Sequence, residues 1–176
     1  ANIQAGGTTP DFETTKLARA IATMDLYVMI RPRVGDFIYS ENEFLQMKMA
    51  IERFKKIQVN GFVFGILNQD RTINKAQNAE LVSLAQPLPC TFHRAFDEVK
   101  NGKESLETVI ECGFKTLLTS GQASNVIEGI NTLTSLVEQA GNRIAIMPGG
   151  GLRSTNCKMV SEKARANFYH SSAIID

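Results

Sequence analysis

Hydrophobic and polar positions repeat along the chain as a short apolar run followed by an amphipathic stretch. The runs have the length of buried strands, and the stretches space apolar residues three or four positions apart, as helices do. The predicted strands cover residues 26–30, 62–67, 90–93, 116–119, 144–147 and 167–170. The predicted helices cover residues 11–23, 77–85, 104–112, 125–140 and 155–163, with one more beginning after Ser40.

The helix after Ser40 has the clearest sequence signals. Glu43 stands three residues after Ser40, and this spacing predicts a capping box, in which each side chain bonds the other residue's backbone N–H. Its apolar face is predicted from residues at helical spacing: Phe44, Met47, Ile51 and Phe54. Pro32 has no backbone donor, so the strand over residues 26–30 is expected to end before it.

The repeated strand-and-helix unit predicts an α/β protein built on a parallel sheet. Six strands fit an open, doubly wound sheet and an incomplete barrel equally well, because a closed (β/α)₈ barrel has eight. No low-complexity linker interrupts residues 1–176, so one domain is predicted. The chain opens on Ala1, not on Met, within a glycine-containing loop, and we expect further residues upstream.

Composition narrows the class of protein. The hydrophobic fraction of 43% and net charge of +1 are ordinary for a globular protein and give no sign of a nucleic-acid or membrane partner. No apolar run reaches the roughly 18 residues of a membrane span. The three cysteines, Cys90, Cys112 and Cys157, are far apart and predict neither disulfides nor zinc. We therefore expect a reducing, cytoplasmic setting.

Polar residues gather just after the C-terminal ends of the predicted strands. Ligands bind at this edge in both kinds of parallel sheet, so the one-sided distribution predicts a site there. The candidate residues are Arg31, Arg33, Asp36, His93, Arg94, Asp97, Ser120, Gln122, Gly149, Gly150, Gly151, His170 and Ser171. None of them is assigned as a metal ligand.

Arg31 and Arg33 flank a proline that fixes their direction. Two guanidinium groups can hold a carboxylate or phosphate through forked hydrogen bonds. The alternative is that the two arginines pair with Asp36 or Asp97 and only hold the edge of the sheet together. The sequence leaves both interpretations open.

His93, Arg94 and Asp97 are the candidate catalytic residues. His93 and Arg94 follow a buried strand, and Asp97 is placed to orient either one. Histidine can act as an acid, a base or a metal ligand, although a histidine at a strand end often only satisfies nearby backbone groups. Its position among the other polar strand ends favours a functional role.

The glycine triplet at residues 149–151 stands where a strand turns into a helix. Exposed backbone N–H groups near a helix start favour anions, and the late loops of barrels often hold phosphate. The alternative is a tight turn that only glycine permits. His170 and Ser171 follow the next predicted strand and favour an anion site at the same corner.

Six segments together resemble the CutC family: residues 30–37, 63–65, 91–97, 118–122, 147–151 and 170–173. Residues 1–2 and 6–10 are similar to the loop after that family's second strand, so the resemblance covers the whole chain. It implies a (β/α)₈ TIM-like barrel that here lacks the first strand, first helix and second strand. It also implies a cytoplasmic role in copper homeostasis, through copper binding or handling.

Two departures from the family bear on function. Val34 replaces a usual glycine, which predicts a loop of different shape. The cysteines linked with copper in the family lie upstream of this chain, and Cys90, Cys112 and Cys157 do not match them. Cys112 and Cys157 are expected to be packing residues, and Cys90 to lie at the strand end away from the site. Copper as a ligand therefore rests on the resemblance alone.

The alternative function is that of a TIM-barrel enzyme on a small anionic ligand, such as a phosphorylated one. The candidate residues are hard, cationic and hydrogen-bonding, which suits an oxyanion better than copper(I). Whether any reaction is catalysed stays open. Unpaired strand edges in an incomplete barrel would also favour a homo-oligomer.

Overall fold

The computed structural model describes residues 6–172, and residues 1–5 and 173–176 lie outside the described part. Its centre is a parallel sheet whose strands follow one another in sequence order. The strands are β1 (Tyr27–Met29), β2 (Gly61–Phe64), β3 (Cys90–Phe92), β4 (Thr116–Thr119) and β5 (Ala145–Pro148). This confirms the α/β class and the parallel sheet, and the strand order has no reversal of the kind that defines a doubly wound sheet.

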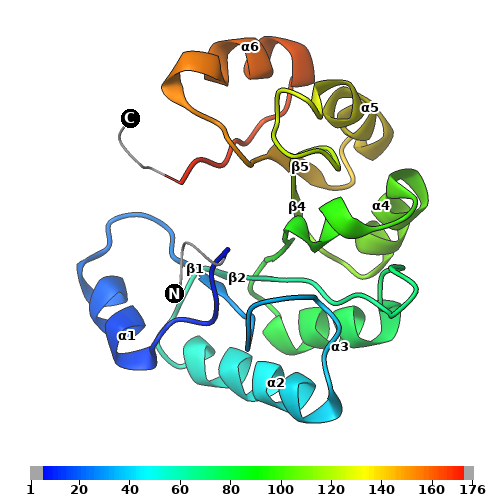
Figure 1. The fold of residues 1–176 in the computed structure, drawn as a ribbon. Helices are drawn as coiled ribbons and strands as arrows, with labels where there is room; N and C mark the ends of the chain where they lie inside the picture. The colour runs from blue at the N-terminus through cyan, green and yellow to red at the C-terminus, as the bar shows by residue number, and fades with distance from the viewer. Residues whose placement is uncertain (1–5, 173–176) are drawn as a thin grey trace.

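Helices alternate with the strands and follow one another around the outside of the sheet (Figure 1). They are α1 (Phe12–Ile21), α2 (Glu41–Lys55), α3 (Lys75–Ala85), α4 (Gly102–Glu111), α5 (Ile130–Ala140) and α6 (Ser154–Ala164). A short 3₁₀ helix, η2 (Arg94–Glu98), lies between β3 and α4. Among the described residues, no helix combines the length and apolar character that crossing a membrane requires.

The start of α2 confirms the predicted capping box. The backbone N–H of Ser40 donates to Glu43 Oε2 at 2.8 Å, and the backbone N–H of Glu43 donates to Ser40 Oγ at 3.3 Å. The predicted apolar face is also buried: Phe44, Met47, Ile51 and Phe54.

Residues 167–170 do not form the predicted sixth strand. They make a single parallel bridge, between Gly149 and His170, in which the His170 N–H donates to the Pro148 carbonyl at 2.9 Å. Phe168 is 55% exposed, so this apolar residue, part of the sequence signal for a strand, is not packed into a core. The segment touches the end of β5 at one point and does not extend the sheet.

The helix predicted over residues 125–140 begins later, at Ile130. Asn125 accounts for the difference, because its side-chain oxygen accepts the backbone N–H groups of Ile127 and Glu128 and stabilises a turn there. Gly121 and Gly129 let this turn approach the end of β4. A Cβ on Gly129 would lie 1.8 Å from the Ser120 carbonyl oxygen, a distance no side chain can occupy.

The two faces of the sheet have different surroundings. Phe64 and Phe92 alternate onto the face that packs against the helices, where both rings contact Phe114 with centroids 5.1 and 5.2 Å away. Met29 and Val63 alternate onto the opposite face, which lines a cavity. The hydrophobic core therefore lies between sheet and helices, and the inner face of the sheet is free for a site.

A buried asparagine links α3 to the end of β2. Asn78 is fully buried, accepts the Ile66 N–H at 3.1 Å and donates to the Ile66 and Asn74 carbonyls at 2.8 Å each. Asn78→Ala would leave the Ile66 backbone groups without these partners, so we expect the free energy of unfolding to fall by roughly 3 kcal/mol. Urea denaturation measures the change. Asn131→Ala, at an exposed position on α5, should change it by less than about 0.5 kcal/mol.

Candidate functional site

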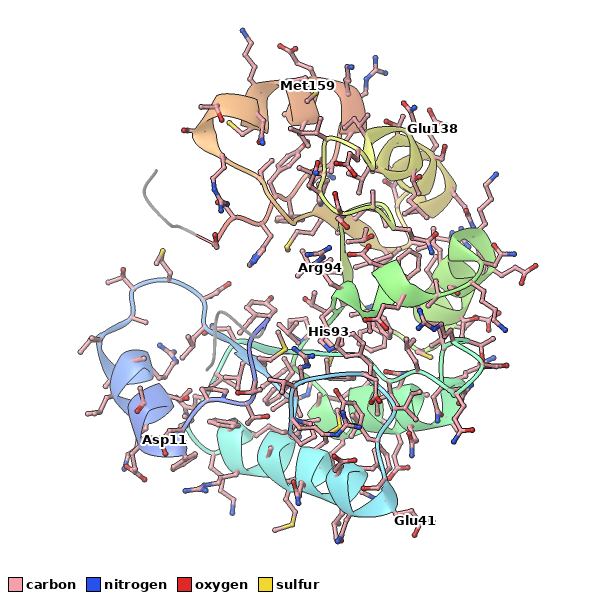
Figure 2. The ribbon with its side chains drawn as sticks, viewed as in Figure 1. Asp11, Glu41, His93, Arg94, Glu138 and Met159 are labelled. Atoms are coloured by element: carbon pink, nitrogen blue, oxygen red, sulfur yellow. The ribbon has the colours of Figure 1, made fainter. Side chains whose placement is uncertain are left out.

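A cavity of about 1210 Å³ lies over the inner face of the sheet and its C-terminal strand ends, which we call the rim cavity. The predicted site residues that line it are Arg31, His93, Arg94, Asp97, Gly150, Gly151, His170 and Ser171. The predicted residues outside its lining are Arg33, Asp36, Ser120, Gln122 and Gly149. Figure 2 shows His93 and Arg94 near the centre of the molecule, where the strands meet.

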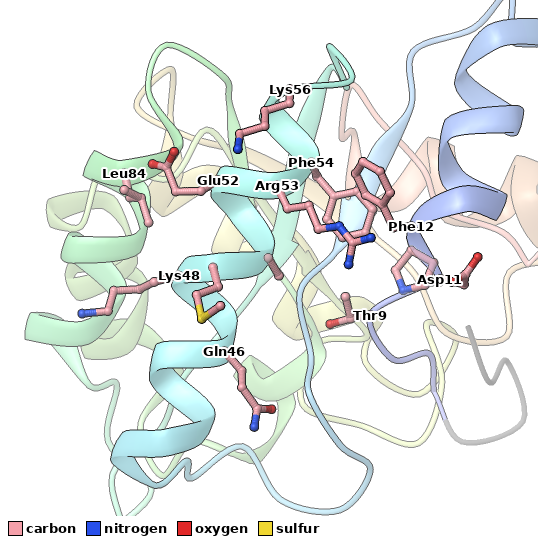
Figure 3. A pocket seen from close by; sticks show the side chains of 13 residues that line it. Thr9, Asp11, Phe12, Gln46, Lys48, Glu52, Arg53, Phe54, Lys56 and Leu84 are labelled. Atoms are coloured by element: carbon pink, nitrogen blue, oxygen red, sulfur yellow. The ribbon is translucent and has the colours of Figure 1, made fainter.

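A second cavity, of about 900 Å³, lies where the start of α1 meets α2 and is lined mainly by residues of α2 (Figure 3). Its cationic side chains are Lys48, Arg53 and Lys56. Arg53 lies over the ring of Phe12, with its guanidinium carbon 4.0 Å from the ring centroid. No predicted site residue lines this α1–α2 cavity.

Arg94 and Asp97 form the best-fixed charged pair in the rim cavity. The tight turn of η2 brings the two side chains together, because residues three apart eclipse in a 3₁₀ helix. Arg94 Nε donates to Asp97 Oδ2 at 2.7 Å, and Arg94 Nη2 donates to Ser120 Oγ at 2.9 Å. The Arg94 side chain is 43% exposed and that of Asp97 is 10% exposed. The pair thus presents its positive member to the cavity.

The Asp97 carboxylate accepts hydrogen bonds from Arg94 and from the loop after β4. Besides Arg94, it accepts the Thr119 hydroxyl, the Ser120 hydroxyl and the backbone N–H groups of Ser120 and Gln122. A carboxylate offers about four acceptor positions, so none is left for a proton from a ligand. We therefore assign Asp97 to positioning Arg94 and the loop after β4. The catalytic role of Asp97 stays a prediction.

The glycine turn after β5 lies against the guanidinium group of Arg94. A Cβ on Gly150 would lie 3.1 Å from both Cζ and Nη1 of Arg94, so the absence of a side chain permits this approach. Gly150 and Gly151 have φ values of +111° and +72°, which favour glycine. Their backbone N–H groups donate to no other group in the described part of the chain. Arg94 and the turn together form a positive corner with unused donors.

His93 is a neutral histidine in the wall of the rim cavity. Burial, with a smaller effect from the nearby Arg31 charge, lowers the pKa of His93 to about 3. Its Nδ1 accepts the Ala95 N–H at 3.3 Å, so the ring proton is on Nε2. Nε2 is buried and has no hydrogen-bond partner among the described residues. At neutral pH the His93 ring is therefore uncharged and Nε2–H is a hydrogen-bond donor. Its role as an acid or base stays a prediction.

The charge state of His93 predicts a pH dependence. The folded pKa lies below the unfolded value near 6.5, so the unfolded state binds more protons between pH 6.5 and about 3. The His93 contribution should reduce stability as pH falls through this window, by up to about 1.4 kcal/mol per pH unit. The difference in urea stability between wild type and His93→Phe, followed from pH 8 to pH 4, measures it. Imidazolium ¹⁵N signals from folded His93 at pH 5.5 would contradict the assignment.

The two arginines that flank Pro32 have different environments. Arg31 is buried and donates to the Gly7 and Gly35 carbonyls at 3.2 and 2.8 Å. Arg33 pairs with Asp36 Oδ1 at 2.8 Å and with Glu43 Oε1 at 2.6 Å. Arg33 thus follows the pairing alternative, and the two arginines do not act together on the rim cavity.

Several other predicted residues use their donors within the protein. Ser171 Oγ donates to the Leu152 carbonyl at 3.0 Å, and Gln122 Nε2 donates to the Val99 carbonyl at 2.7 Å. Gly149 donates its N–H to the Thr119 carbonyl at 2.9 Å. His170 lines the cavity, and partial burial and then the Arg94 charge lower its pKa.

Sequence analysis missed Arg153 and two methionines. Arg153 follows the glycine turn, lines the rim cavity and donates to the Leu152 carbonyl at 2.9 Å and to Ser172 Oγ at 3.3 Å. The position of Arg153 shortly after the glycine triplet could have indicated that it belongs to the site. Met29 and Met147 line the cavity from the inner face of β1 and β5, which strand alternation could have indicated.

The cysteines do not assemble a copper site in the described residues. Cys90 and Cys112 are buried, and burial raises their thiol pKa values to about 12 and about 11. Cys157 is exposed, so the expectation that it is a packing residue is wrong. Among residues 6–172 no group of three or more His, Cys, Asp or Glu side chains is arranged to hold a metal ion. Copper(I) prefers soft thiolate or thioether ligands, and burial keeps the Cys90 and Cys112 thiols protonated at neutral pH.

Comparison with known proteins decides the family. The model of the CutC family matches residues 1–175. This chain belongs to the CutC family. Among its CutC relatives, "Copper homeostasis protein cutC homolog" of Mus musculus is 42% identical over 168 residues, covering 96% of this chain and 62% of the relative. The Homo sapiens homologue is 40% identical, covering 98% and 63%. The chain thus spans less than two thirds of the length of these relatives.

Solved structures agree with the family and the fold. A crystal structure of a CutC protein from Streptococcus agalactiae matches with a TM-score of 0.94 and 32% identity, covering 99% of this chain and 86% of that one. The aldolase QR15 matches with a TM-score of 0.69 over 90% of this chain and 73% of that one. At 16% identity, this second likeness shows the fold alone.

Proposed function

We propose that this CutC chain takes part in copper homeostasis, as the names of its mouse and human relatives state for them. Identity of 40% or more over nearly the whole chain supports a shared role. The three cysteines are free, which supports a reducing, cytoplasmic location. The sequential parallel strands and the outer ring of helices support a (β/α)₈ barrel as the architecture.

We further propose that the rim cavity binds a small oxyanion, such as a phosphate monoester. The observation that carries this proposal is Arg94, held by Asp97 and Ser120 against the donor-rich turn at Gly150 and Gly151. Guanidinium and backbone N–H groups recognise oxyanions, and a site at the C-terminal strand ends is where such folds bind ligands. Copper homeostasis and oxyanion binding are compatible, since a role in copper homeostasis does not require copper to occupy the rim cavity.

A copper-tolerance experiment tests the cellular role. A bacterial strain lacking its own CutC gene would be complemented with this chain, with Arg94→Gln and with Arg33→Gln. We expect the chain and Arg33→Gln to restore the parent strain's growth in copper, and Arg94→Gln to fail. Equal growth with and without the chain would contradict a role in copper homeostasis. If Arg94→Gln restored growth in copper at equal expression, the role in copper homeostasis would not depend on Arg94 in the rim cavity.

Isothermal titration with inorganic phosphate, repeated at a low and a high chloride concentration, tests oxyanion binding directly. We expect a saturable one-to-one isotherm whose affinity is lower at high chloride, because salt screens a charged contact. Absence of binding at millimolar phosphate would contradict the proposed oxyanion function.

A further inference from the structure

His93 presents a buried hydrogen-bond donor that the protein itself leaves unused. Its Nδ1 is occupied by the Ala95 N–H, which fixes the proton on Nε2, and Nε2 has no partner among the described residues. Buried polar groups in proteins are nearly always paired, so an exception in the lining of a cavity indicates a partner supplied from outside.

The His93 ring is held in one orientation by its neighbours. The Phe37 ring lies 4.7 Å away between centroids, and Phe92 makes an edge contact at 6.0 Å. Gly65 gives the ring its space, because a Cβ there would lie 2.9 Å from His93 Nδ1. Burial keeps the ring neutral, as its low pKa indicates. Nε2–H is thus a fixed, uncharged donor, which is the form that polarises a carbonyl without giving up its proton.

His93 and Arg94 are consecutive residues that line the same cavity with different chemistry. Arg94 offers the charged N–H groups of its guanidinium next to the glycine turn, and His93 offers the uncharged Nε2–H. Apolar side chains line the same cavity from the inner face of the sheet: Met29, Val63, Leu118 and Met147. A ligand that satisfies these groups together has an oxyanion, a carbon body and an uncharged acceptor oxygen.

We propose that His93 is a specificity-determining residue whose Nε2–H binds the carbonyl oxygen of a small organic phosphate held by Arg94. This inference rests on the proposed oxyanion function and names the ligand class: a phosphate monoester that carries a carbonyl group on its carbon body. The phosphate supplies the charge for Arg94 and the glycine turn. The carbonyl supplies the acceptor that His93 lacks.

The test compares acetonyl phosphate with propyl phosphate, two esters that differ by a carbonyl in place of a methylene group, with inorganic phosphate as a third probe. Isothermal titration on the wild-type chain should give acetonyl phosphate the lower Kd, by about tenfold or more. In His93→Phe the ratio between the two esters should fall to about one. Equal affinity for the two esters in wild type, or a preference that persists in His93→Phe, would overturn the proposal.

The three probes separate this inference from the function on which it rests. If inorganic phosphate and both esters fail to bind, the oxyanion function is wrong and the role of His93 fails with it. If they bind with equal affinity, only the role of His93 is wrong. An NMR measurement on the wild-type chain tests the proposal even if His93→Phe does not fold. In ¹⁵N-labelled wild type the His93 Nε2–H resonance should move downfield with acetonyl phosphate and not with propyl phosphate, and an unmoved resonance overturns the proposal.

Discussion

Replacing Arg94 by Gln is expected to weaken phosphate binding to the rim cavity by about 30-fold or more. Removing one partner of a partly desolvated charge contact costs at least about 2 kcal/mol, which corresponds to that factor. Arg33 does not substitute for Arg94, because Arg33 pairs with Asp36 and Glu43 and does not line the cavity. Isothermal titration with inorganic phosphate measures the change.

Arg33→Gln is the matched control for this prediction. It removes the same charge from the same edge of the sheet, but from a residue that does not line the rim cavity. Its Kd for phosphate should stay within about twofold of wild type at physiological salt, because salt screens a charge that does not contact the ligand. Equal losses in Arg94→Gln and Arg33→Gln would mean that phosphate responds to the general field of the rim, and would contradict a site at Arg94.

Asp97→Ala is expected to lower the free energy of unfolding by about 3–5 kcal/mol. The substitution removes the acceptor for donors on Thr119, Ser120 and Gln122 as well as Arg94. A buried donor left without a partner costs about 1–3 kcal/mol, and several are left here. Urea denaturation of wild type and variant measures the difference.

Asp36→Ala provides the comparison for Asp97. Asp36 also accepts from an arginine three residues away in sequence, but its side chain is 58% exposed. Exposed ion pairs contribute little, so the expected loss is below about 1 kcal/mol. If Asp97→Ala cost no more than Asp36→Ala, the assignment of Asp97 as the residue that positions the rim would be wrong.

The sequence predicted the elements whose signals are local. The Ser40–Glu43 spacing and the apolar face of α2 need only helix geometry, and both are confirmed. The parallel α/β sheet follows from the repeated unit. Residues 167–170 failed as a strand because a strand depends on ladder partners elsewhere in the chain, and only one bridge forms there.

The sequence predicted that polar residues after the strand ends would lie close together, but it did not predict what each one contacts. Strand ends placed His93 and Arg94 at one cavity, as expected for a parallel sheet. Sequence could not tell that Asp97 would be saturated by donors from the loop after β4, because those contacts join residues more than 20 positions apart. It also could not give the charge of His93, since that depends on burial against Phe37 and Arg31.

The most direct test of the central claim is an NMR titration of the ¹⁵N-labelled chain with inorganic phosphate. The account predicts saturable shifts at the Gly150 and Gly151 amides and at Arg94 Nε–H, with one common Kd. The α1–α2 cavity, whose lining includes Lys48, Arg53 and Lys56, is the internal comparison within the same spectra (Figure 3). Shifts confined to that cavity, or none at the glycine turn when phosphate is saturating, would contradict an oxyanion site at the rim.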